Sequence, residues 1–142
     1  FLDESGCNTD MTRRYAYSLG GSRAVDSAPL SKPKNTTILS SIQLDGTLRY
    51  TTFSGGTTVE RFKRYLETDL LPHLNGNSVL IMDNMKSHHP IEKLWSKVKS
   101  FLRKFKARTL DALPNAIQCA FQTVSPSDCS GWFHSCGYSP YF

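Results

Sequence analysis

The chain has 142 residues, of which 39% are hydrophobic and 20% charged, the ordinary composition of one soluble globular domain. No apolar run approaches the ~20 residues that cross a bilayer, and the four cysteines form no C-x-x-C pair, which excludes a membrane span and the common zinc modules. The net charge of +5 is concentrated in the window from Lys86 to Arg108, where eight basic residues face only Glu92. A positive field of this kind attracts polyanions, most commonly nucleic acid.

The N-terminal part of the chain predicts strands separated by a long loop. The opening Phe1-Leu2-Asp3 is typical of the end of a strand, so we expect a further segment upstream. Residues 5–34 are turn-rich and predict a loop with short strand pieces. Residues 35–43 and 47–53 are rich in β-formers, and Asp45-Gly46 between them predicts a two-residue hairpin.

A helix and a short strand are predicted next. Thr57 as N-cap and Glu60 three residues later form the pattern of a capping box, and Pro72 marks the end of that helix. Residues 78–82 predict a short buried strand that ends at Asp83.

The last third predicts helices. Residues 91–106 carry apolar side chains at steps of three and four, Thr109 is placed to cap a second helix, and Ser125-Pro126 fits the N-cap and first position of a third. Trp95 is interpreted as a core residue of the first of these helices. Strand, hairpin, helix, strand and helices in this order predict an α/β fold with a mixed sheet.

Three carboxylates are candidates for a metal site. Asp3 and Asp83 each follow an apolar strand-like run, and neighbouring strands that end in carboxylates would suit a hard cation such as Mg²⁺. Glu92 shares a helical stripe with Lys99 and Arg103 beside the apolar face. The alternatives are a turn or cap role for the aspartates and a solvated helix face for the stripe.

Several ordered motifs carry a family resemblance. F-L-D-E-S-G at 1–6, T-R-R-Y at 12–15, I-M-D-N-M-K-S-H-H at 81–89 and P-I-E-K-L-W-S-K-V-K at 90–99 resemble the transposases of bacterial insertion sequences, in the IS-six-thirty group of the mariner superfamily. The resemblance implies an RNase H-like mixed sheet flanked by helices and a DDE triad that binds Mg²⁺ or Mn²⁺. Matched motif by motif, the triad is Asp3, Asp83 and Glu92.

The implied activity is metal-dependent DNA strand cleavage and strand transfer. The partner is double-stranded DNA, both element ends and target; a homodimer is compatible with it, and the expected location is the nucleoid in the bacterial cytoplasm. The residues expected to hold DNA phosphates lie on the helix that begins near Glu92: Lys93, Lys97, Lys99, Arg103, Lys104 and Lys106. His88 and His89 are interpreted as a polar loop near the DNA and not as metal ligands.

The chain departs from the family pattern in two places. The family carries a helix-turn-helix region upstream, and its spacer between the second Asp and the Glu is several times longer than the eight residues between Asp83 and Glu92 here. We therefore expect one catalytic domain over 1–142, truncated at the N-terminus, shortened between residues 89 and 90, and lacking the edge strand. Such a site is expected to be impaired, and the alternative is an inactive remnant that binds DNA by charge alone.

Overall fold

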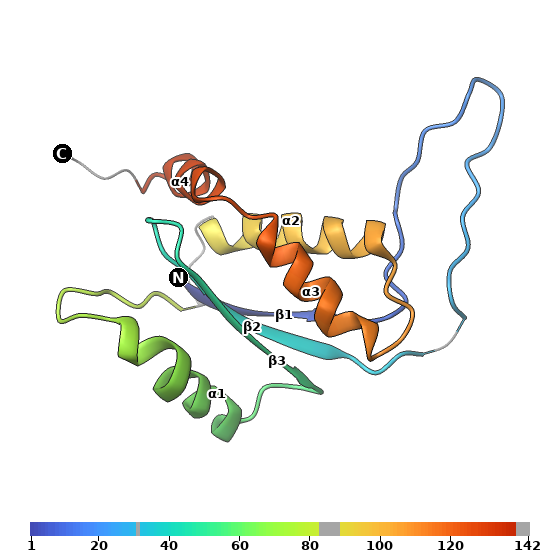
Figure 1. Cartoon of the computed structure of the whole chain (residues 1–142). Coiled ribbons are helices and arrows are strands. Elements are labelled where there is room, and N and C mark those ends of the chain that lie inside the picture. Colours follow the sequence, from blue (N-terminus) through green and yellow to red (C-terminus); the bar gives the residue numbers. More distant parts are fainter. Residues whose placement is uncertain (31, 83–88, 139–142) are drawn as a thin grey trace.

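The computed structural model describes residues 1–30, 32–82 and 89–138. Its strands and main helices are, in chain order, β1 (Leu2–Cys7), β2 (Thr36–Ile42), β3 (Leu48–Ser54), α1 (Val59–Tyr65), α2 (Pro90–Phe105), α3 (Ala112–Gln122) and α4 (Pro126–Ser135). Figure 1 shows α1 on one face of the sheet and α2 and α3 on the other, with α4 beside α2. The sheet is therefore the middle layer of three.

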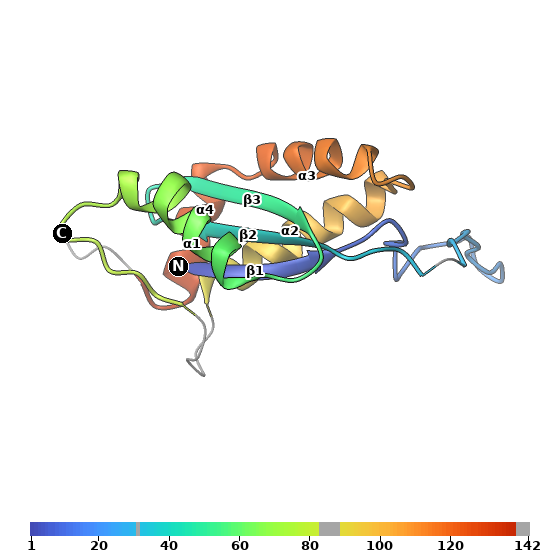
Figure 2. The ribbon, with the colours of Figure 1, turned by 90° about the horizontal axis from the view of Figure 1, so that it is seen from below.

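β2 is the central strand and pairs antiparallel with both β1 and β3 (Figure 2). Because successive side chains on a strand point to opposite faces, Ile38 and Ile42 pack under α2 while Leu39 packs under α1. Three antiparallel strands followed by helices confirm the predicted α/β class and are consistent with part of an RNase H-like fold. The parallel pairing of a mixed sheet is present in the described residues as one isolated bridge, between Leu2 and Met82.

The hairpin between β2 and β3 has a loop one residue longer than predicted. The N–H of Gln43 donates to the carbonyl of Thr47 at 3.0 Å, and the N–H of Gly46 donates to the carbonyl of Gln43 at 3.2 Å. These bonds enclose a three-residue loop, 44–46, which requires positive φ at its last position. Gly46 supplies it with a φ of 91°. The sequence predicted Gly46 as the second residue of a two-residue loop, whereas it is the third residue of a three-residue loop.

Two separate cores hold the layers together. The larger one fills the space between the sheet and α2, α3 and α4, and its buried aliphatic members include Ile38, Ile42, Leu94, Val98, Leu113 and Ile117. The smaller one lies under α1 and consists of Leu2, Leu39, Tyr65 and Leu70. The hydroxyl of Tyr65 lies 2.9 Å from Ser41 Oγ, so its polar end is satisfied inside that core.

Helix α1 begins one residue later than the capping pattern predicted. Thr58, not Thr57, is the N-cap, and its side chain accepts the N–H of Arg61. The hydroxyl of Thr57 instead donates to the Glu4 carboxylate on β1. Thr57 therefore forms a hydrogen bond with a distant strand, and Thr58 is the residue that caps α1. After α1 the chain continues through a π-helical turn, Leu66–Leu70, and a 3₁₀ turn, Leu71–His73.

The predicted strand at 78–82 is reduced to one contact with β1. The N–H of Leu2 donates to the carbonyl of Ile81 at 2.9 Å, and Met82 forms the parallel bridge. The other residues of this segment, 78–81, have no strand pairing of their own. The segment therefore runs beside the start of β1 without forming a full strand, which differs from the prediction.

The C-terminal helices follow the predicted pattern closely. The apolar stripe of α2 is buried at Leu94, Trp95 and Val98, and Trp95 is 7% exposed. Helix α3 begins at Ala112, so its N-cap is Asp111 and not the predicted Thr109, although Thr109 Oγ1 accepts the N–H of Ala112 at 3.2 Å. No helix in the described part of the chain has both the length and the apolarity that a bilayer span requires.

Candidate functional site

Asp3 is the second residue of β1, so this strand begins at the apolar Phe1-Leu2 run and does not end there as predicted; its side chain faces helix α2. Its Oδ1 accepts the N–H of Glu4 at 2.7 Å, and its Oδ2 accepts the indole N–H of Trp95 at 2.9 Å. The second bond joins the first strand to the middle of α2 and fixes the orientation of the carboxylate. Trp95 was identified from the sequence only as a core residue. The signal that could have revealed its second role is general, because a buried Trp N–H usually has an acceptor.

Asp3 and Glu92 line the same small pocket. The pocket has a volume of about 80 Å³, and its wall also contains Phe1, Met82 and His89. Glu92 sits in the first turn of α2, two residues after Pro90 at its first position. A carboxylate in the first turn is also favoured by the helix dipole, so this placement stabilises the helix whatever else it does. The fold thus brings two of the three predicted site residues to one cavity.

His89 is part of this wall and not of a polar loop. It is 8% exposed and occupies the N-cap position of α2. Its ring packs edge-on against Phe1 with 5.3 Å between ring centroids. The partly buried ring of Phe1 and the buried ring of His89 together form one end of the pocket.

The second predicted aspartate, Asp83, lies outside the described residues. The last described residue before it is Met82, which forms a bridge with Leu2, the neighbour of Asp3. That Asp3 and Asp83 meet at one sheet edge therefore stays a prediction. Within residues 1–30, 32–82 and 89–138, no three His, Cys, Asp or Glu side chains are grouped as a metal site would require.

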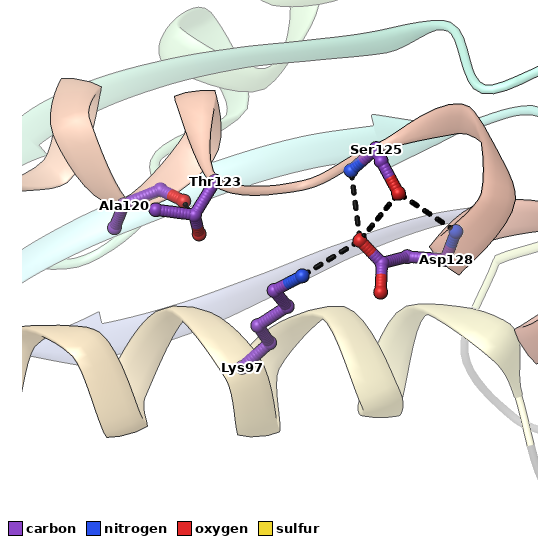
Figure 3. A network of polar contacts seen from close by, with 5 residues as sticks. All are labelled: Lys97, Ala120, Thr123, Ser125 and Asp128. Carbon is purple, nitrogen blue, oxygen red and sulfur yellow. Dashed lines mark hydrogen bonds and ion pairs between the residues drawn. The ribbon is translucent and has the colours of Figure 1, made fainter.

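The six basic residues predicted to hold DNA fall into two groups. Lys97 donates to Asp128 Oδ2 on α4 at 2.6 Å (Figure 3), and Lys106 Nζ lies 2.6 Å from both carboxylate oxygens of Asp26. These two ammonium groups are partly neutralised within the molecule. The remaining four line surface hollows on either side of α2: Lys93, Lys99, Arg103 and Lys104.

Asp128 owes its low pKa to the same contact. The hydrogen bond from Lys97, together with those from the N–H and hydroxyl of Ser125, lowers the pKa of Asp128 from 3.8 to about 2. In return the Ser125 hydroxyl accepts the N–H of Asp128, which completes a capping box at the start of α4 (Figure 3). The predicted cap of this helix is confirmed, and its acidic residue also ties α4 to α2.

The N-terminal part of the chain matches a known protein family. Residues 1–90 match the family described as DDE superfamily endonuclease, and the chain belongs to this family. The matched range contains Asp3 and Asp83 and ends two residues before Glu92. The family acts on DNA and generally uses a divalent metal ion. No curated protein matches the chain significantly.

Proposed function

We propose that this chain is the catalytic domain of a DNA transposase of the insertion-sequence type, with Asp3, Asp83 and Glu92 as its metal-binding carboxylates. The observation that carries the proposal is the shared pocket of Asp3 and Glu92. These residues are 89 positions apart in the sequence, and the pocket wall also contains Met82, the residue before Asp83. Membership of a DNA-cutting family supports the same reading.

The donor set at this pocket suits Mg²⁺ or Mn²⁺. Carboxylate oxygens are the ligands that hard divalent cations prefer. Each oxygen of Asp3 accepts one N–H bond in the structure and keeps a further lone pair for a cation. Such an ion, when bound, supplies positive charge to the phosphoryl oxygens during an in-line displacement. The residues around the pocket hold the two carboxylates in position. Trp95 fixes the orientation of Asp3, and Pro90 begins the helix that carries Glu92.

We further propose that catalysis is impaired in the present chain. Only eight residues link Asp83 to Glu92, which can reach ~28 Å when extended, so reach is not the obstacle. The obstacle is the weak anchoring of the segment before Asp83, because that segment pairs with β1 through a single bridge, between Met82 and Leu2. A catalytic carboxylate displaced by about half an ångström already loses much of its effect. This observation favours the second candidate function, an inactive remnant that binds DNA by charge.

A nicking assay separates the two candidates. The purified chain is incubated with Mg²⁺ or Mn²⁺ and a duplex carrying the sequence that flanks its gene, beside a version whose spacer between residues 89 and 90 is restored. Asp83→Asn should abolish any nicking by either protein. Glu67→Gln is the matched control, because Glu67 is an exposed carboxylate in the turn after α1, on the other side of the sheet.

Each outcome of the assay assigns the function. Nicking by the short chain that is lost in Asp83→Asn and kept in Glu67→Gln supports an active transposase. Nicking confined to the restored protein supports the remnant. Nicking that survives Asp83→Asn in both proteins would refute the assignment of the carboxylate site.

A further inference from the structure

A long arm connects β1 to β2 and extends beyond the end of the sheet (Figure 1). Its described residues, 8–30 and 32–35, contain no helix or strand. The arm is nevertheless tied down at two places. Arg108 donates to the carbonyls of Thr9 and Met11 at 3.0 and 3.2 Å, and Lys106 forms its ion pair with Asp26. Both anchoring residues follow α2, so the root of the arm stays beside the C-terminal part of that helix.

Two hollows lie where the arm meets α2, and both are lined by positive side chains. The first has a volume of about 360 Å³ and contains Arg13, Arg14, Arg103 and Lys104 in its wall. The second has a volume of about 320 Å³ and contains Arg14, Lys99 and Arg103. Because Arg14 and Arg103 line both, the hollows form one continuous surface, which we call the arm–helix groove.

The charge balance of the groove is strongly positive. Five cations line it (Arg13, Arg14, Lys99, Arg103 and Lys104), and Asp10 is the one acidic residue in the two walls. Asp26, the partner of Lys106, also attracts Arg13, but in the described part of the chain neither of the two ion pairs includes any of these five. Like charges held together repel one another, and the anchoring of the arm by Arg108 and Lys106 keeps them together. An anion bound in the groove would relieve this repulsion.

We propose that the arm–helix groove binds the phosphate backbone of duplex DNA, with Arg13 and Arg14 of the arm acting together with Lys99, Arg103 and Lys104 of α2. Guanidinium groups match phosphate oxygens with two parallel hydrogen bonds, and three of the five cations are arginines. The proposal rests on the proposed function, since it takes DNA as the substrate. It adds the two arginines of the arm to the DNA-binding surface and gives Lys106 a different task, which is to hold the arm through Asp26.

The test is the salt dependence of DNA binding. The double variant Arg13→Ala/Arg14→Ala removes two cations from the arm. The double variant Lys63→Ala/Arg64→Ala removes two exposed cations from α1, on the opposite face of the sheet, and is its matched control. Fluorescence anisotropy with a labelled random-sequence duplex is measured for the full chain and both variants over a series of KCl concentrations. Circular dichroism checks that all three proteins are folded.

The loss of affinity that follows from removing two phosphate contacts can be calculated. Each contact contributes a factor of about 8 to affinity at 0.1 M salt, so the arm variant should bind roughly 60-fold more weakly, with a salt slope smaller by about 1.8. The α1 variant should keep the affinity and the slope of the unaltered chain. Adding Arg103→Ala to the arm variant should weaken binding further.

Three results would overturn the proposal, and they point to different faults. If the unaltered chain binds duplex DNA and both double variants lower the affinity equally, the groove is not the DNA-binding site, while the proposed function stands. If the unaltered chain binds no duplex even at low salt, the groove and the DNA substrate fail together. If potassium phosphate displaces the duplex much more strongly than KCl at equal ionic strength, the groove is a site for free phosphate and not for a DNA backbone.

Discussion

Replacing Trp95 by Phe tests whether the indole N–H holds Asp3 in place. The change removes the 2.9 Å hydrogen bond to Oδ2 of Asp3 but keeps an aromatic ring in the core. A hydrogen bond to a charged group contributes about 1.5–3 kcal/mol, and water in the adjoining pocket can replace part of it, which favours the lower end. The smaller ring also leaves a cavity of roughly 40 Å³, which costs about 1 kcal/mol. We expect Trp95→Phe to lower the free energy of unfolding by about 2.5 kcal/mol.

A double-mutant cycle separates the bond from the cavity. In an Asp3→Ala background the acceptor is already absent, so Trp95→Phe should cost only the cavity, about 1 kcal/mol. The coupling energy between the two positions should then be about 1.5 kcal/mol. Urea denaturation followed by far-UV circular dichroism measures all four proteins. Equal losses from Trp95→Phe in the two backgrounds would refute the view that Trp95 positions Asp3.

Two further predictions concern stability away from the pocket. Because Lys97 and Ser125 hold the pKa of Asp128 at about 2, below its ordinary 3.8, this carboxylate stabilises the fold above pH 3.8 and the benefit is lost as the pH falls toward 2. After allowance for solvent screening the loss is about 1 kcal/mol, and acid titrations of stability should show that this component is absent in Asp128→Asn. Gly46→Ala should destabilise the hairpin, since φ is 91° and a Cβ would lie 2.8 Å from the Cα of Pro126. An unchanged melting temperature would contradict this close contact of the loop with α4.

Local patterns in the sequence predicted most of the secondary structure. The β-rich runs became β2 and β3, the apolar stripe became the buried face of α2, and Ser125 capped α4. Each of these depends on residues only a few positions apart, so the physical cause is contained in a short window. The capping prediction at Thr57 failed by one residue because Glu4, on a distant strand, forms a hydrogen bond with that hydroxyl.

The candidate site could be predicted only in part for the same reason. The family motifs named Asp3 and Glu92, and the fold places both on one pocket. The hydrogen bond from Trp95 to Asp3 joins residues 92 positions apart, and no pattern on α2 alone indicates it. Likewise, the stripe of basic residues predicted one uniform DNA-binding face. Acidic partners on α4 and on the arm distinguish Lys97 and Lys106 from the rest.

The sequence by itself thus determined which segments form strands and helices, where the positive charge is concentrated and which carboxylates are candidates for chemistry. The tertiary structure decided which side chains meet. Arg13 and Arg14 join the cations of α2 because Arg108 and Lys106 hold the arm beside that helix. Helix and strand formation is governed by neighbours in the chain, whereas contacts between layers depend on how the sheet and its helices pack. That packing is set by the whole core at once, and no single segment contains it.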